Sequence, residues 1–260
     1  YPQSFNPAVL RQLKSWTKRS AQKATHILTI SQATKADIIK HYQIDPDKIT
    51  VTYPGTSGRF EKEVQGQEVE AVKQKYHITG QYLFTLGTKQ PKKNIPRLIE
   101  VFSTLNRLSN YPIDLVIAGK TWHQFRSEID PERSRRAKGI IELGYVPDDD
   151  LPALYKGAAA FVLPSLYEGF GIPVLEAMTV GTPVVVSNSS SLPEIAGQSG
   201  VLVDPDDTDS IARGLKLVLS LSKEKRLQLV QQGKQQAQKF TWRKCAQQTL
   251  KVLYDIATKR

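Results

Sequence analysis

Two glutamates, Glu168 and Glu176, bracket a glycine-rich segment and are the residues of this chain best suited to chemistry. Gly169 and Gly171 lie between them, and glycine lets the backbone turn sharply and approach a ligand closely. A helix is expected just after these glycines, and its first N–H groups and its dipole attract an anion such as phosphate. Carboxylates at such a place can accept hydrogen bonds from sugar hydroxyls, as the acidic residue of a dinucleotide site does with ribose. The segment therefore predicts a site for a nucleotide-sugar.

The residues around the glycines indicate how the two glutamates are positioned. The apolar run 160–164 is typical of a buried strand, and the stretch from Val174 to Val180 has the apolar density of a buried helix. Pro173 suits the first turn of that helix, because an N–H at this position would have no helical partner. This order predicts a strand, a glycine turn and a helix, with Glu168 at the mouth of the turn and Glu176 about one turn into the helix.

The same alternation of short apolar runs and helical patterns continues through most of the chain. It predicts an α/β fold, a Rossmann-like parallel sheet with helices on both faces and a ligand site at the carboxyl ends of the strands. The expected strands are 82–87, 113–119, 140–144, 160–164, 183–187 and 201–203. The expected helices of this part are 94–108, one within 125–137, 149–156, 174–180, 192–196, 209–221 and 223–240.

The charge of the chain raises the question of anionic partners, because its formal net charge is +11. The basic residues are spread out, apart from an acid-free segment, 11–23, that could form a basic helix face. No alternation of aromatic and basic residues resembles a platform for single-stranded nucleic acid, so we expect no nucleic-acid partner. A solvated basic face and a peripheral contact with an anionic membrane both stay open.

The composition also bears on the compartment. The chain has one cysteine, Cys245, which excludes an intramolecular disulfide and fits a reducing environment. It has no run of about 18 apolar residues, so no membrane span is expected. We therefore expect a cytoplasmic protein, in peripheral contact with the inner face of the membrane if the basic face binds lipid. The first residue is Tyr1 rather than Met, which favours a piece of a longer protein.

Two further motifs have ordinary structural interpretations. The acidic run 148–150 follows Val146-Pro147 and fits a helix cap with charges in the first turn. Ser191-Leu-Pro-Glu194 fits a capping box, although a role for Glu194 in the donor site stays open. Neither the acidic run nor the four histidines have convincing metal-ligand spacing, so no metal is expected.

Several segments together carry a resemblance to a known family. The most specific are Gly87 to Asn94 and the paired-glutamate segment, Pro164 to Met178. The others are 119–120, 144–147, 151–155, 181–184, 191–194 and 240–242. From about Thr25 onward the chain resembles the C-terminal, donor-binding part of family 4 (group 1) glycosyltransferases, and mannosyltransferase-like members in particular. These are retaining enzymes of the two-domain GT-B fold.

The resemblance implies a division of the chain. Residues 1–56 would be the end of an N-terminal, acceptor-binding domain with the crossover between domains. Residues 57–240 would be the nucleotide-sugar-binding Rossmann-like domain. Residues 241–260 would be a helix that packs back toward the N-terminal domain, most of which lies outside this chain.

The resemblance also implies roles for individual residues. Lys93 matches the lysine that grips the diphosphate and is a catalytic candidate with Glu168, which would face the transferred sugar. The other member of the basic pair is often an arginine just after Gly87, where this chain has Thr88, so Lys92 and Lys89 are candidates for the second cation. Glu176 would bind the ribose hydroxyls. The base would be recognised by Tyr145 and Val146, and the sugar and diphosphate by N–H groups of Gly169, Phe170, Gly171 and Ile172.

The function that follows is transfer of a hexose from a nucleotide-diphosphate sugar to a glycan or lipid-linked acceptor, with retention of configuration. GDP-mannose is the first donor expected and a UDP-hexose the second, with no cofactor and no metal. A nucleotide-sugar-binding module without activity by itself is the alternative. A dinucleotide oxidoreductase is excluded, because no Gly-x-Gly-x-x-Gly follows the first strand of the main domain with an acid about 20 residues on.

Overall fold

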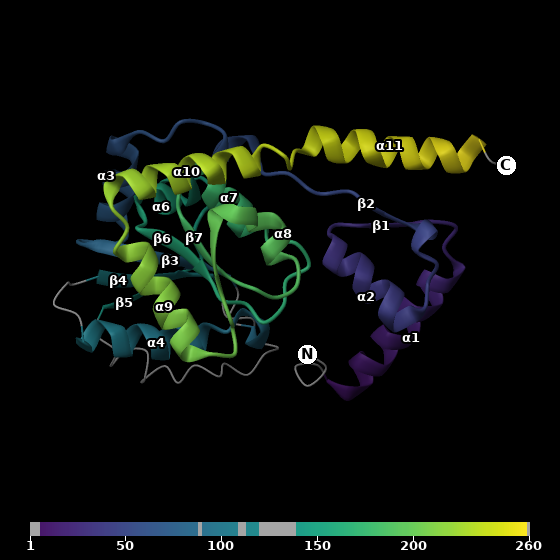
Figure 1. Cartoon of the computed structure of the whole chain (residues 1–260), viewed down its shortest axis with the longest axis horizontal. Helices are drawn as coiled ribbons and strands as arrows, with labels where there is room; N and C mark the ends of the chain where they lie inside the picture. The colour runs from purple at the N-terminus through teal and green to yellow at the C-terminus, as the bar shows by residue number, and fades with distance from the viewer. Residues whose placement is uncertain (1–5, 88–89, 109–112, 120–138, 259–260) are drawn as a thin grey trace. The chain divides into compact units, whose positions relative to one another are not determined.

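The structure, a computed structural model, describes residues 6–87, 90–108, 113–119 and 139–258. The chain divides into two compact units (Figure 1). One unit comprises Tyr1–Gly55 and Phe240–Arg260, and the other comprises Thr56–Lys239. The larger unit contains every residue predicted to bind the donor.

A six-stranded, entirely parallel sheet forms the centre of the larger unit, as predicted. Its strand order is β5-β4-β3-β6-β7-β8. The strands are β3 (Gln81–Leu86), β4 (Ile113–Ala118), β5 (Ile140–Gly144), β6 (Ala160–Leu163), β7 (Val184–Ser187) and β8 (Gly200–Val203). All residues of β6 and β7 are buried, which explains why these strands are continuous apolar runs rather than alternating ones.

Helices cover the sheet on both faces (Figure 1). On one face, apolar residues of α4 (Ile95–Leu108) and α9 (Thr208–Leu219) pack against Leu83 and Val162 in one buried cluster. On the other face, the ring of Tyr155, from α6 (Leu151–Gly157), makes edge contacts with Phe84 and Phe161 at centroid distances of 5.1 Å each. The remaining helices of the unit are η3 (Gly58–Phe60), α3 (Gly66–Lys75), η4 (Pro91–Lys93), α7 (Ile172–Val180), α8 (Leu192–Ala196), η5 (Gly197–Ser199) and α10 (Lys223–Ala237). The helix predicted within 125–137 lies outside the described residues.

The order of the strands defines where a ligand is expected. The chain runs from β3 outward to β4 and β5, then returns to the other side of β3 and continues through β6, β7 and β8. The direction of winding therefore reverses between β3 and β6. In open parallel sheets, ligands bind at such a switch point, beyond the carboxyl ends of the strands.

The smaller unit contains the helices α1 (Pro7–Lys23), α2 (Gln32–Tyr42), η2 (Pro46–Lys48) and α11 (Trp242–Thr258), and the parallel strands β1 (Ile27–Thr29) and β2 (Ile49–Val51). The Ser31 side chain accepts a hydrogen bond from the N–H of Thr34 and caps α2. The rings of Tyr53 and Phe240 meet edge to face at a centroid distance of 5.2 Å. Within the described part of the chain, no helix is both long enough and apolar enough to cross a bilayer.

Candidate functional site

The loops after β3 and β6 meet at the switch point of the sheet. The main-chain N–H of Leu166, after β6, donates to the carbonyl of Lys92, after β3, at 2.8 Å. Asn94 joins the same two loops, because its side-chain amide donates to the carbonyl of Pro164 at 3.1 Å. These contacts hold the loop that carries the basic residues beside the loop that carries the first glutamate.

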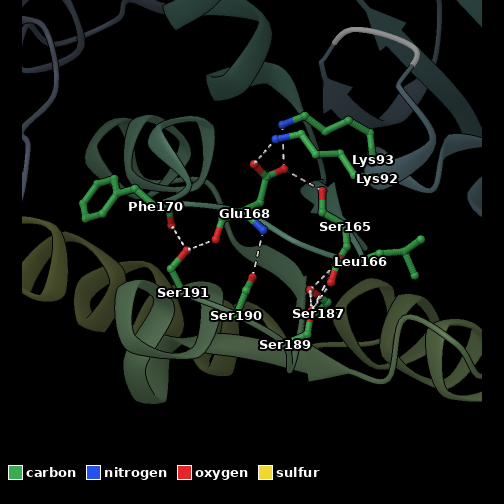
Figure 2. A network of polar contacts seen from close by, with 10 residues as sticks. All are labelled: Lys92, Lys93, Ser165, Leu166, Glu168, Phe170, Ser187, Ser189, Ser190 and Ser191. Carbon is green, nitrogen blue, oxygen red and sulfur yellow. Dashed lines mark hydrogen bonds and ion pairs between the residues drawn. The ribbon is translucent and has the colours of Figure 1, made fainter. Parts of the chain in front are cut away.

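Glu168 is buried in this region and has two cationic neighbours (Figure 2). Lys93 Nζ lies 2.6 Å from Glu168 Oε1, and Lys92 Nζ lies 3.8 Å from Oε2. The hydroxyl of Ser165 also donates to Oε1, at 2.7 Å. The negative charge of Glu168 is therefore balanced locally, as a buried carboxylate requires.

Gly87 makes room for the Lys93 side chain. A Cβ atom at position 87 would lie 3.3 Å from both Cδ and Cε of Lys93, closer than most real contacts of this kind. The aliphatic part of Lys93 thus crosses the backbone where β3 ends, and its ammonium group reaches Glu168. At this position glycine is favoured by the close approach of Lys93, and a larger residue would displace the Lys93 side chain by a few tenths of an ångström.

The N-terminus of α7 faces the same end of the sheet, and no side chain caps it. Gly171, at its N-cap position, has a φ of 112°, which L-residues with a side chain rarely adopt. A Cβ there would also lie 2.7 Å from Leu192 Cδ2. Ile172 begins the helix and Pro173 lies in its first turn, so the predicted strand, glycine turn and helix are confirmed.

Glu176 belongs to a second polar cluster, one turn into α7. Tyr155 Oη donates to Glu176 Oε2 at 2.9 Å, and the ring of Tyr155 is completely buried in the aromatic cluster of the sheet. Burial raises the pKa of Glu176 to about 7, even though the Tyr155 hydrogen bond opposes the shift. Glu176 is thus a carboxyl group that changes charge near neutral pH.

The loop after β5 contains the two residues predicted to meet the base. Gly144 has a φ of 66° and ends the strand, Tyr145 is 62% exposed and Val146 is buried. Three acidic residues follow in the chain. Asp148 and Asp149 lie 3.5 and 3.1 Å from Arg59, and Asp150 accepts a 2.6 Å hydrogen bond from Lys75.

Comparison with known proteins decides the family. A sequence profile of the family described as Glycosyl transferases group 1 matches residues 68–236, well over half of the chain. The chain belongs to the group 1 glycosyltransferases. A profile described as Glycosyltransferase Family 4 matches residues 1–57. The resemblance expected from the paired-glutamate segment is confirmed.

Individual relatives of this group 1 glycosyltransferase include several named mannosyltransferases. O-antigen chain mannosyltransferase B of Escherichia coli is 36% identical, over 93% of this chain and 63% of its own length. The MMP alpha-(1->4)-mannosyltransferase of Mycolicibacterium hassiacum is 28% identical, over 94% of this chain and 57% of its own length. The chain thus spans less than two thirds of either relative.

Solved structures give the fold of the group 1 chain. Anabaena Alr3699/HepE in complex with UDP-glucose is similar with a TM-score of 0.82 at 18% identity, over 98% of this chain and 70% of that one. At this level of identity the similarity concerns the fold. It confirms the expected GT-B architecture of a parallel sheet covered by helices.

Two local predictions about this group 1 chain were wrong. Ser191 is at the N-cap position of α8 but makes no side-chain cap, because its backbone is in the helical rather than the extended region. Asp150 is at the N-cap position of α6 and also makes no side-chain cap. Its carboxylate accepts hydrogen bonds from Lys75 and Tyr76 instead.

Other contacts of the site were not predicted. Tyr155 was part of a matching segment, but nothing in the sequence indicated that it contacts Glu176. The hydroxyl groups of Ser187, Ser189, Ser190 and Ser191 contact the loop around Glu168. Four serines within five residues, at the end of a predicted strand and just after it, were the available signal. The candidate second cation Lys89, like Thr88, lies outside the described residues.

Proposed function

We propose that the protein containing this chain transfers a hexose, mannose in the first instance, from a nucleotide-diphosphate sugar to a glycan or lipid-linked acceptor with retention. The single observation that carries the proposal is the contact of Lys93 with Glu168, in the loop that leads into the uncapped helix α7, at the switch point of the sheet. It brings together groups suited to a diphosphate and a carboxylate suited to a sugar.

The reaction requires charges of opposite sign to be stabilised at the two ends of the bond that breaks. Cleavage of a glycosyl–phosphate bond develops negative charge on the diphosphate and positive charge on the anomeric carbon. Lys93, Lys92 and the N–H groups of residues 169–172 would stabilise the leaving diphosphate. Glu168 would lie against the sugar and stabilise the positive charge, so Glu168 and Lys93 are the proposed catalytic residues.

The other binding roles follow the same arrangement. Gly87 allows Lys93 to reach the diphosphate, Glu176 accepts hydrogen bonds from the ribose hydroxyls, and Tyr145 and Val146 bind the base. Lysine side chains and the helix N-terminus supply the positive charge that a metal provides in other transferases. We therefore propose that donor binding is independent of metal.

Two donors are supported by different observations. GDP-mannose is the first candidate, because the E. coli and M. hassiacum relatives are named mannosyltransferases. A UDP-hexose is the second, because Alr3699/HepE, which has a similar fold, binds UDP-glucose. Titration of this chain with GDP, UDP, GDP-mannose and UDP-glucose by calorimetry, with and without Mg²⁺, separates them. Mg²⁺-independent binding of GDP and GDP-mannose alone is expected; binding of the uridine pair alone would overturn the mannose assignment.

An inactive nucleotide-sugar-binding module remains the alternative function. It shares every donor contact with the enzyme, so donor binding does not distinguish the two. The enzyme is distinguished from the module by transfer of radiolabelled mannose by the full gene product, in the presence of membranes that supply acceptor. Binding without transfer under these conditions would favour the module.

Donor affinity is expected to rise with pH through the titration of Glu176. Its pKa of about 7 makes the carboxyl mostly neutral at pH 6 and mostly ionised at pH 8. The ionised form accepts charge-assisted hydrogen bonds from ribose hydroxyls, so affinity for the nucleotide-sugar should increase about tenfold over this range. Calorimetry at several pH values measures the change. The phosphates of a nucleotide-sugar carry no group that titrates in this range.

Glu176→Gln is the control for this titration. It keeps the size of the side chain but cannot ionise, so its affinity should be low and independent of pH. A variant whose affinity follows the wild-type pH profile would remove the ribose assignment from Glu176.

We also propose peripheral contact with anionic lipid at the cytoplasmic face of the membrane, which would bring the site to lipid-linked acceptors. Its support is α1, in which Leu13 and Trp16 are exposed and no residue is buried. The same helix carries the basic residues Arg11, Lys14, Lys18, Arg19 and Lys23. Sedimentation with vesicles that contain phosphatidylglycerol tests the contact, and equal binding to neutral vesicles would contradict it.

A further inference from the structure

Ser187, the last residue of β7, and the segment that follows it are bonded to the main chain of the Glu168 loop through serine side chains (Figure 2). Ser187 Oγ donates to the carbonyl of Ser165 at 2.6 Å, and Ser189 Oγ lies 3.1 Å from the carbonyl of Leu166. Ser190 Oγ accepts the N–H of Glu168 at 2.9 Å. Side chains from one loop thus fix the backbone of another loop, which carries the proposed catalytic carboxylate.

Ser191 has an unusual part in this network. It is completely buried, and its hydroxyl lies 2.9 Å from the carbonyl of Glu168 and 2.7 Å from that of Phe170. A serine at the N-cap of a helix normally accepts from the N–H groups of its own helix. Ser191 makes no such bond to α8, and its one hydroxyl proton serves the two carbonyls of the neighbouring loop instead.

The orientation of these carbonyls fixes the orientation of two N–H groups. In a planar trans peptide, the C=O of one residue and the N–H of the next point in opposite directions. Since the carbonyls of Glu168 and Phe170 point at Ser191, the N–H groups of Gly169 and Gly171 point away from it. Gly171 is the N-cap residue of α7, so the 170–171 peptide comes directly before the uncapped first turn of that helix.

The backbone of the serine segment is itself held in an uncommon conformation. Ser190 has a φ of 52°, in the left-handed region that residues other than glycine rarely occupy. In that conformation its hydroxyl accepts from the N–H of Glu168 while the adjacent Ser191 reaches the two carbonyls. The serine segment therefore combines a strained backbone at Ser190 with the hydrogen bonds that hold the Glu168 loop.

We propose that Ser191 is a positioning residue for the donor diphosphate: it turns the 168–169 and 170–171 peptides so that their N–H groups face the distal phosphate. The inference rests on the proposed function of this site. The hydroxyl acts through the backbone and does not itself touch the donor. Without it, the two peptides are free to rotate and to present carbonyl oxygens, which repel a phosphate.

Calorimetry with GDP and GMP tests the proposal on this chain, because only GDP has a distal phosphate. Ser191→Ala is expected to weaken GDP binding about tenfold, which corresponds to the net contribution of one or two hydrogen bonds. It is expected to change GMP binding less than twofold. Ser191→Cys keeps the shape with a weaker donor, so its GDP-to-GMP affinity ratio should lie between wild type and Ser191→Ala. If the alanine variant does not fold, the GDP-to-GMP affinity ratio of the cysteine variant tests the positioning role.

Ser199→Ala is the matched control. Ser199 is also a buried serine, and its hydroxyl donates to the carbonyl of Ala196 at 2.6 Å, outside the Glu168 loop. The GDP-to-GMP affinity ratio of Ser199→Ala should equal that of wild type. Equal weakening of GDP and GMP in Ser191→Ala, or no weakening, would overturn the positioning role alone. Absence of binding of guanine and uracil nucleotides by the wild type would overturn the proposed function, and the inference with it.

Discussion

Replacing Lys93 by alanine is expected to weaken binding of the nucleoside diphosphate about 100-fold and to leave binding of the nucleoside unchanged. The Lys93 ammonium contacts Glu168 at 2.6 Å, in the loop that leads into the uncapped helix α7, and is the proposed principal cation for the diphosphate. Charge-assisted hydrogen bonds to a phosphate contribute about 1.5–3 kcal/mol each, which corresponds to roughly ten- to 100-fold in affinity. Calorimetry with GDP and guanosine measures both affinities on the same preparation.

The same substitution is expected to destabilise the fold. Among the described residues, the polar contacts then left to the Glu168 carboxylate are the more distant Lys92 and the hydroxyl of Ser165. Breaking a buried ion pair in this way lowers the free energy of unfolding by about 3 kcal/mol. Urea denaturation followed by circular dichroism measures the loss. The double variant Lys93→Ala/Glu168→Gln should recover most of it, since the buried charge is then removed.

Lys75→Ala is the control for stability. Lys75 Nζ also lies 2.6 Å from a carboxylate oxygen, that of Asp150, but its side chain is 53% exposed. An exposed pair contributes less than about 1 kcal/mol. If Lys93→Ala and Lys75→Ala unfold at the same urea concentration, the pair with Glu168 does not behave as a buried one. If GDP binding also survives in Lys93→Ala, the diphosphate assignment is wrong.

The fold could be predicted from the sequence because its strands are local apolar runs. Parallel strands covered on both faces are apolar throughout, and here several predicted strands end in a glycine, such as Gly87 and Gly119. The errors were in element boundaries and were small. For example, α7 begins at Ile172 rather than Val174, because Pro173 is compatible with the first helical turn. Such boundaries depend on the cap, which in this helix is a glycine without a side chain.

The contacts inside the site were less predictable. The partner of Glu168 is 75 residues away in the chain, and the two meet only because β3 and β6 are neighbours in the sheet. The resemblance to a family indicated Lys93 as a diphosphate ligand, but not its ion pair with Glu168. For Ser191, the local pattern predicted a bond within α8, and the real partners are carbonyls of another loop. Side-chain contacts with a distant main chain have no sequence pattern.

Replacing Glu168 by glutamine is expected to reduce transfer by about 100- to 1000-fold, the range found when a group that stabilises transition-state charge is removed. Glutamine keeps the shape and can still accept from Ser165 and Lys93, so the loop should keep its conformation. It lacks the negative charge that would stabilise the anomeric carbon as the glycosyl–phosphate bond breaks. Single-turnover transfer from GDP-mannose by the full gene product measures the loss.

Nucleotide binding provides the second measurement on Glu168→Gln, because it separates a catalytic role from a structural one. Lys93 is 12% exposed, and its ammonium contacts the Glu168 carboxylate at 2.6 Å. Without that charge, Lys93 is more available to a diphosphate, so GDP should bind as tightly as to wild type or more tightly. Glu70→Gln, which removes an exposed partner of Lys73, should change neither quantity. A parallel loss of GDP binding and transfer in Glu168→Gln would mean that the carboxylate organises the loop and Lys93, and does not act on the sugar.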